Sequence, residues 1–447
     1  MIPKRSPKIR FEFVPARKQS ILGGLPALEA LRQRFGLWPK LRALPGIDPR
    51  VRPSHGYAPE RIVAQFLYSF CSGGASLADA ERLDEEPLAR QLARVERFAD
   101  QTQLGEWLRK QSEGSIAAFW EWIAEFVRWV IAQAQTERWT HAGRAAGFFD
   151  DTQIEVFGSS FEGARINDNG DLALSWQTLW IGPFLLAGQL GSPGDVSGAL
   201  PGRLAPPRTF WQDRPSDFLA DSGSSSAEYL PAVDGAAFTH WGVSYNKWTT
   251  VPERTAAVLP ESAGTVAGQT TWRDGTQVIE QHPGIRHTPE GGEFTFPLAA
   301  ARWKKDGDRF WRYAFVAHDE RRGDAAAVRG RHRLKGGKEQ MFREVLRGLD
   351  LHHPPGESLT ANRMFHAIAA LAYNLMKAGQ RLCLPDEGQS GTVPTLLKVM
   401  VRLPATRVRP ARRRVARVEV AVGRLAWWRN WEARWWRAGA GPVAATG

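Results

Sequence analysis

Three acidic side chains of this chain lie where a carboxylate could do chemistry. Asp150 follows the apolar run GFF, Asp221 follows the short apolar run FLA, and Glu339 lies in the first turn of a predicted helix, in RLKGGKEQMFREV. Carboxylates at two strand ends and one helix can converge on a pair of divalent cations, and hard ions such as Mg²⁺ prefer oxygen ligands. Two such ions, ~3.5–4 Å apart, can activate a nucleophile and stabilise the leaving oxygen of a phosphodiester. These residues are therefore candidate catalytic and metal-binding groups for Mg²⁺, with Mn²⁺ as a substitute ion.

Each acid also has an ordinary structural interpretation. An aspartate at a strand end commonly forms a turn or caps a helix, which would suit Asp150 and Asp221. Glu339 suits the positive end of a helix dipole, and the basic residues around it suit an exposed surface. The three acids alone do not show that they form one metal site, so both interpretations stay open.

Hydrophobic periodicity predicts the elements that would position the acids. Residues 1–145 are predicted to be mostly helical, because Pro59 suits the first turn of one helix, Gly73 suits its end and Ser76 suits the cap of the next. Two more helices are predicted, over about residues 102–110 and 115–135.

After Gly147 the pattern changes to short apolar runs separated by turn residues, which predicts strands. The runs cover residues 147–151, 171–182, 183–191, 238–248 and 309–319, and helical periodicity returns over 338–349 and 360–382. We therefore predict an α/β fold in five segments: a helical N-terminal region (1–145), a first core part (146–250), a β-rich insertion (251–308), a second core part with the glutamate helix (309–384) and a basic C-terminal region (385–447).

The charge of the chain favours a polyanionic partner. Its 447 residues include 59 Lys and Arg against 47 Asp and Glu, a net charge of +12, and residues 404–437 alone carry ten arginines and two glutamates. Backbone binding by arginine is independent of sequence and sensitive to salt, so nucleic acid is the first partner to consider. The stretch WWRNWEARWW could stack on unpaired bases, or it could pack on the protein surface or form a disordered tail. We expect this tail to lack the apolar periodicity of a core helix and to be dispensable for folding.

Several classes of site are excluded by composition. Only two cysteines, Cys71 and Cys383, are present, so neither a disulfide framework nor a cysteine zinc site is expected. The most apolar helical run carries Glu121, Glu125 and Arg128 at its middle, which predicts a packed helix rather than a membrane span. No GxxxxGK[ST] stretch occurs, so no nucleotide cofactor is expected.

The order and surroundings of the acids resemble the cut-and-paste DDE transposases of bacterial insertion sequences, the group called transposase DDE domain group 1. The resemblance covers roughly residues 50–420. The acidic motifs of that group are matched by FFDDT with Gly158, by LADSG with Asn246, and by Glu339 at the start of a helix. Further matches are Tyr57, Pro59, Glu60, Gly73, Gly74, Asp79 and Leu83 before the first motif, and Ala361-Asn362 and Ala372-Tyr373-Asn374-Leu375 after the third.

The resemblance implies an RNase H-like catalytic core in which Asp150, Asp221 and Glu339 bind the metal, preceded by an N-terminal region (1–145) that binds DNA. The ligand in the first motif is the first of its two acids. Because a strand alternates its faces, Asp150 and Asp151 can share one metal pair only if the strand ends between them. We therefore expect Asp151 to point away from the site and to accept hydrogen bonds from a turn that begins at Thr152.

The basic residues near the third motif depart from the related enzymes. Those enzymes carry a tyrosine and an arginine seven and four positions before the glutamate and a lysine seven after it, where this chain has His332, Lys335 and Leu346. Whether cleavage passes through a hairpin intermediate is therefore open. The residues predicted to contact DNA are His332, Lys335, Lys338, Arg343, Arg347, Arg412, Arg413 and Arg414.

The resemblance implies a transposase that binds transposon terminal inverted repeats, cleaves them by metal-dependent hydrolysis and joins the 3′-OH to target DNA. The resemblance also implies a homodimer on DNA and no membrane association. The expected location is the cytoplasm of a bacterium, in association with the nucleoid. Two alternatives stay open: a DNA-binding descendant that has lost catalysis, and a metal-dependent nuclease of the same fold with another role. Short inverted repeats flanking the gene would favour the transposase.

Overall fold

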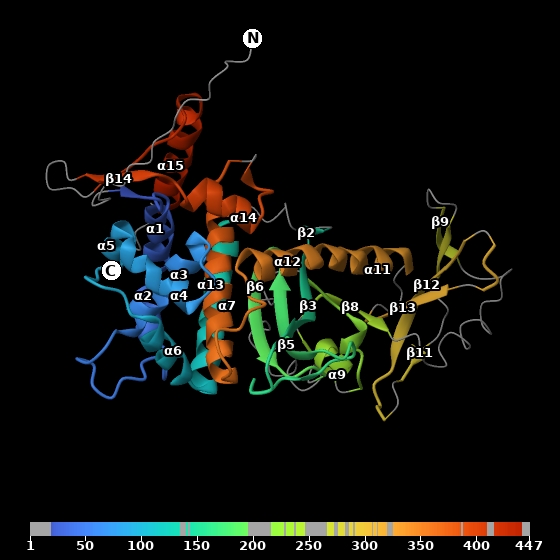
Figure 1. The fold of residues 1–447 in the computed structure, drawn as a ribbon. Coiled ribbons are helices and arrows are strands. Elements are labelled where there is room, and N and C mark those ends of the chain that lie inside the picture. Colours follow the sequence, from blue (N-terminus) through green and yellow to red (C-terminus); the bar gives the residue numbers. More distant parts are fainter. Residues whose placement is uncertain are drawn as a thin grey trace, which may run out of the picture.

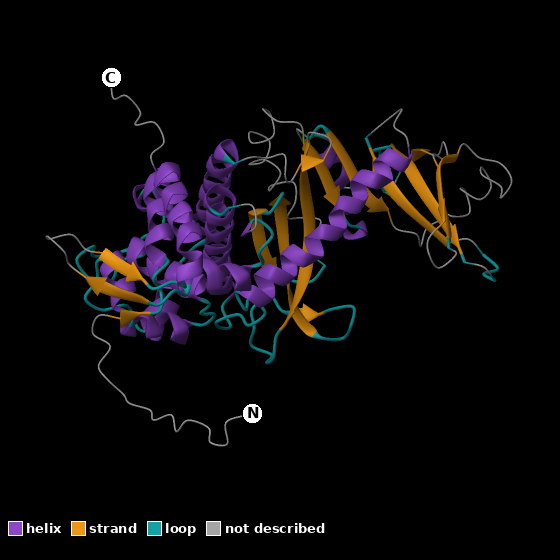
Figure 2. Cartoon of the chain, turned by 90° about the horizontal axis from the view of Figure 1, so that it is seen from above, coloured by secondary structure: helices purple, strands orange, loops and turns teal. Residues whose placement is uncertain are grey.

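The chain is a mixed α/β protein in which N-terminal helices precede a large mixed sheet and further helices follow it, as the computed structural model in Figure 1 shows. The structure describes residues 19–134, 140–141, 144–194, 216–227, 229–236, 238–245, 266–271, 276–281, 286–288, 291–305, 307–310, 312–319, 325–385, 388–408 and 415–439. Figure 2 shows most of the helices gathered at one end of the molecule and most of the strands at the other, with a long helical segment lying across the strands.

The N-terminal region is helical, as predicted. Its helices are α1 (Leu25–Phe35), α2 (Leu37–Arg42), α3 (Pro59–Ser72), α4 (Leu77–Arg82), α5 (Pro87–Ala93), α6 (Gln101–Arg109) and α7 (Glu113–Gln133).

The residues predicted to start, end and cap helices do so at the predicted positions. Pro59 is the first residue of α3, and Gly73 ends that helix in the left-handed conformation, with φ of 84°. The Ser76 side chain accepts a hydrogen bond from the Asp79 backbone N–H, and the Asp79 carboxylate accepts one in return from the Ser76 backbone N–H. Pro59, Gly73 and Asp79, which match the transposase motifs, therefore have structural roles at helix ends.

The main sheet has the order β4-β5-β3-β7-β8-β13-β12-β10-β9, with β2, β6 and β11 attached beside it. Strands β3, β7 and β8 run parallel to one another, and the other pairs are antiparallel. The strands are β2 (Thr140–His141), β3 (Arg144–Glu155), β4 (Arg165–Ile166), β5 (Leu172–Ile181), β6 (Phe184–Gly191), β7 (Ser216–Ala220), β8 (His240–Tyr245), β9 (Val266–Thr271), β10 (Gln277–Gln281), β11 (Arg286–His287), β12 (Phe296–Lys304) and β13 (Arg312–His318). Strands from the predicted first core part and from the predicted insertion thus pair in one sheet.

The expectation that Asp150 lies at the end of its strand is wrong. Strand β3 continues to Glu155, because its antiparallel pairing with β5 extends from Gly147↔Ile181 to Glu155↔Ala173. What ends near Asp150 is the pairing with β7 on the other edge of β3, whose last register pair is Phe149↔Ala220.

Helices of the second half cover the sheet and join it to the N-terminal helices. They are α9 (Tyr229–Asp234), α11 (Ala325–His332), α12 (Lys338–Gly348), α13 (Leu359–Cys383) and α14 (Val393–Leu396), with a short 3₁₀ segment over 333–337 between α11 and α12. The buried α13 contacts α3, α7 and β6. Its Asn374 side chain donates to the Leu185 carbonyl at 2.7 Å and accepts from the Leu185 N–H at 2.9 Å, which fixes α13 to β6. Asn374, another residue of the transposase motifs, is thus a structural anchor.

The expectation that the C-terminal tail lacks a core helix is also wrong. Helix α15 (Leu425–Gly439) buries Trp431 and Trp435 against the main core and contacts α1 and α13. Before it, β14 (Ala405–Val408) pairs with both β1 (Gln19–Ser20) and β15 (Val415–Val418), so the tail forms a small sheet with the first described strand. Within the described residues no helix is long and apolar enough to cross a membrane.

Candidate functional site

Two of the three candidate acids lie side by side. Strands β3 and β7 are parallel, and Phe149 pairs in register with Ala220. Asp150 and Asp221 are the residues that directly follow this pair. Adjacent strands are about 4.8 Å apart, which places both carboxylates within reach of one cation. In open α/β sheets, ligands bind outside the carboxyl ends of the strands where the strand order reverses. The order reverses here, because β3 has β5 on one side and β7 on the other.

Asp150 faces the side of the sheet that α12 covers. It lies opposite Thr178 on β5, and directly opposed residues of an antiparallel pair share a face. Trp180, two residues further along β5, lies on that face and contacts Phe342 of α12, with ring centroids 5.6 Å apart. The Asp150 carboxylate, the Asp221 strand end and α12 therefore belong to the same side of the sheet.

Lys335 forms an ion pair with Asp221. The ammonium nitrogen of Lys335, in the 3₁₀ segment before α12, contacts Asp221 Oδ2, and the lysine side chain is only 14% exposed while that of Asp221 is 50% exposed. Asp221 also accepts a hydrogen bond from the Ser222 N–H at 3.0 Å. Its position in this structure makes Lys335 the counter-ion of a candidate metal ligand, and its contact with DNA stays a prediction.

Glu339 lies one helical turn beyond Lys335, in the first turn of α12 as predicted, and is exposed to solvent. It does not join the two aspartates in a cluster: among the described residues there is no group of three or more His, Cys, Asp or Glu arranged to hold a metal ion. The structure thus brings Asp150 and Asp221 together and leaves Glu339 on the helix that packs on the same face.

His332 is an internal residue of the site. Its Nε2 lies 3.2 Å from the Ala220 carbonyl oxygen and 3.1 Å from Ser244 Oγ, so the imidazole joins the end of α11 to β7 and β8. A carbonyl only accepts, so Nε2 carries the proton and donates to Ala220. Burial lowers the pKa of His332 to about 4, which keeps the ring neutral at pH 7. The structure therefore gives His332 a structural role next to Asp221, and its contact with DNA stays a prediction.

Asp151 points to the opposite face from Asp150, as expected, although its partners differ from those expected. Its carboxylate accepts hydrogen bonds from Ser175 Oγ at 3.0 Å and from Gln153 Nε2 at 3.1 Å. These donors lie on β5 and β3 and not in a turn at Thr152, because β3 is still extended there.

The other predicted DNA contacts divide into two groups. Arg343 and Arg347 are exposed on α12 at four-residue spacing after Glu339, so the three form one solvent-facing stripe. The side chain of Lys338 lies outside the described part of the chain, as do Arg412, Arg413, Arg414 and the motif residue Asn246.

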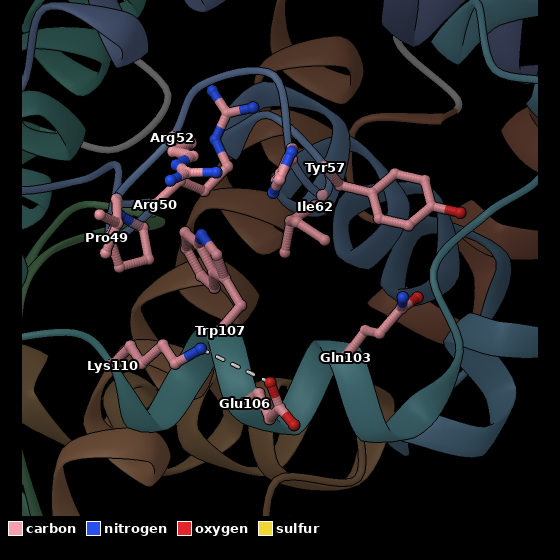
Figure 3. A pocket seen from close by; sticks show the side chains of 12 residues that line it. Pro49, Arg50, Arg52, Tyr57, Ile62, Gln103, Glu106, Trp107 and Lys110 are labelled. Carbon is pink, nitrogen blue, oxygen red and sulfur yellow. Dashed lines mark ion pairs between the residues drawn. The ribbon is translucent and has the colours of Figure 1, made fainter.

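A separate cavity of about 480 Å³ lies in the helical region between α6 and the loop before α3. Figure 3 shows Trp107 of α6 and Lys110, which follows that helix, on one side and Arg50 and Arg52 of the loop on the other. The bidentate contact of Arg50 with Asp48 holds this loop, at 2.8 Å for both hydrogen bonds. None of the three candidate acids lines this cavity.

One residue of the site, Ser244, escaped prediction, and two others have contacts that were not predicted. Ser244 offered no signal, because a serine inside a strand has no distinctive sequence context. The roles of Lys335 and His332 were missed because their partners lie more than 80 residues away in the chain, and the only hint was their position just before Glu339.

His332 makes the stability of the fold dependent on pH. Its pKa is about 4 in the folded protein against about 6.5 when unfolded, so the unfolded chain binds a proton first as the pH falls. The stabilisation is complete above pH 6.5 and is lost progressively towards pH 4, at about 1 kcal/mol per pH unit. His332→Gln keeps an N–H donor for Ala220 and removes the titration. Urea unfolding at pH 7 and pH 5 should give a smaller loss of stability for the variant than for the wild type, and equal losses would contradict a neutral, internal His332.

Comparison with protein-family models finds no family that matches this chain, and a search of curated proteins finds no match either.

Proposed function

We propose that this chain is a DDE-type DNA transposase that binds transposon ends, cleaves them by Mg²⁺-dependent hydrolysis and joins the freed 3′-OH to target DNA. The observation that carries the proposal is the register of β3 and β7, which sets Asp150 beside Asp221 at a reversal of strand order. In the strand order β6-β5-β3-β7-β8, the pairs β6–β5 and β5–β3 are antiparallel, and the pairs β3–β7 and β7–β8 are parallel. This arrangement supports an RNase H-like core.

The donor set suits a hard divalent ion. Asp150 and Asp221 offer carboxylate oxygens from adjacent strand positions, and Asp221 already holds a cation in the form of the Lys335 ammonium. These two residues would hold Mg²⁺ or Mn²⁺, and Glu339 would supply a third carboxylate. The bound ion would activate a water or hydroxyl nucleophile and stabilise the leaving oxygen of the phosphodiester.

The protein's own residues would bind and orient the DNA. Arg343 and Arg347 project from α12 on the stripe that carries Glu339, so a phosphate backbone lying along this stripe would pass Glu339. Arg412, Arg413 and Arg414 would add contacts that do not depend on sequence. A homodimer would bring the two transposon ends together.

A second candidate is a DNA-binding descendant without catalysis. The observation in its favour is that no three-acid cluster forms among the residues that the structure describes, while Lys335 neutralises Asp221. Cleavage separates the two candidates, since both would bind the same DNA.

The test is excision of a marked segment in cells. A donor plasmid would carry a resistance marker between the inverted repeats that flank the gene, and the protein would be supplied from a second plasmid. A transposase gives precise donor breaks at the repeats and insertions of the marker elsewhere, both lost with Asp221→Asn. Binding to the repeats without breaks would favour the inactive descendant, and breaks unrelated to the repeats would favour a nuclease with another role.

A further inference from the structure

We propose that Lys335 is a built-in counter-ion that competes with the divalent cation for Asp221, and that a DNA phosphate relieves this competition by drawing the ammonium away. The inference rests on the proposed function, because it concerns how the same acids acquire their metal. It assigns Lys335 a role in coupling DNA binding to metal binding, in place of a simple contact with DNA.

The geometry places the ammonium on a candidate ligand atom. Lys335 Nζ contacts Asp221 Oδ2, and the register of β3 and β7 sets Asp221 next to Asp150. An ion that uses both carboxylates would meet the lysine charge within a few ångströms, and like charges at that separation repel each other. The lysine and the divalent ion therefore cannot both hold Asp221 at full strength.

The local structure keeps Lys335 in place when DNA is absent. The His332 ring, one turn earlier, is hydrogen-bonded to Ala220 and Ser244, so the segment that carries Lys335 is fixed to β7, the strand that ends just before Asp221. The lysine side chain is mostly buried, while the carboxylate it contacts is half exposed. Solvent and ligands can thus approach the pair from the side of Asp221, where a phosphate oxygen would offer the ammonium another partner.

Thermodynamic linkage then gives a consequence for both ligands. If DNA removes the lysine from Asp221, DNA raises the affinity for the metal, and the metal raises the affinity for DNA by the same factor. The DNA-free protein would bind metal weakly, which would limit metal-dependent cleavage to the protein–DNA complex.

The experiment measures Mn²⁺ binding to the DNA-free, full-length protein by electron paramagnetic resonance of the free ion. Lys335→Met should bind Mn²⁺ about tenfold more tightly than the wild type, a factor kept modest because the Asp221 side of the pair is open to solvent. Lys335→Gln provides a second variant with a polar side chain of similar reach, and Lys335→Arg, which keeps the charge, should resemble the wild type.

The matched control is Lys40→Met. Lys40 also forms an ion pair with a glutamate, Glu125, but in the N-terminal helices, so this variant changes the net charge equally without touching Asp221. Its Mn²⁺ affinity should equal that of the wild type.

Two other outcomes would overturn the inference in different ways. If the wild type and both neutral variants bind Mn²⁺ equally, and Asp150→Asn abolishes that binding, the acids hold metal without competition and only the role of Lys335 is wrong. If none of the proteins binds Mn²⁺, the proposed metal function itself fails, and the inference fails with it.

Discussion

Asp150→Asn is expected to abolish Mg²⁺-dependent cleavage of transposon-end DNA and to leave DNA binding intact. The substitution keeps the size of the side chain and removes the charge that a hard cation requires. Asp150 lies at the position where β7 stops pairing with β3, so its loss removes one of the two adjacent carboxylates. We expect the cleavage rate at saturating Mg²⁺ to fall by several orders of magnitude.

The neighbouring acid provides the matched control. Asp151 faces the other side of the sheet, where it accepts hydrogen bonds from Ser175 and Gln153. Asp151→Asn should therefore lower the cleavage rate only modestly, through a weakened contact between β3 and β5. Equal losses in the two variants would imply that both acids bind metal, and a larger loss for Asp151→Asn would show that the register is assigned wrongly.

Trp435→Ala is expected to destabilise the whole protein by about 3–5 kcal/mol, the usual cost of emptying a buried tryptophan site. The Trp435 side chain is only 4% exposed and lies against α13, where a Cβ added to Gly379 would meet the Trp435 ring at 3.1 Å. Because α13 also contacts the N-terminal helices and β6, this cavity would open at a junction of the fold.

Chemical unfolding provides the measurement for this variant. Trp428→Ala, at a half-buried position on the same helix, should cost clearly less, and truncation after Leu403 should cost more than either because it also removes β14 and β15. A truncated protein as stable as the wild type would contradict the packing of α15 on the core and would restore the view that the tail is dispensable.

Local signals predicted the local structure well. Pro59, Gly73 and Ser76 act through their own backbone preferences and near neighbours, so the sequence around them is sufficient to place the helix ends. The strand-rich centre and the late helices were likewise visible in the spacing of apolar residues.

Features that depend on distant partners were not predicted. Strand β3 continues past its two acids because β5 offers partners as far as Ala173, which outweighs the turn preference of paired aspartates. The C-terminal tail was expected to lack the apolar periodicity of a core helix, yet in α15 Trp431 and Trp435 lie on one stripe at four-residue spacing, and the helix contacts α1 and α13.

The candidate site was likewise predicted only where local sequence is sufficient. The three acids were chosen from their local context and from a resemblance in motif order, and neither can establish that Phe149 pairs with Ala220. That register, and the contact of Lys335 with Asp221, join residues about 70 and 110 positions apart, so only the folded chain reveals them.

The most direct test of the central claim is the anomalous scattering of Mn²⁺ in crystals of the protein bound to its repeat DNA. We predict a manganese peak within coordination distance of both the Asp150 and Asp221 carboxylates, at about 2.0–2.2 Å from their oxygens, with a DNA phosphate beside it and Lys335 withdrawn from Asp221. DNA bound in the complex with no manganese at these two carboxylates, and with Lys335 still paired to Asp221, would contradict the account.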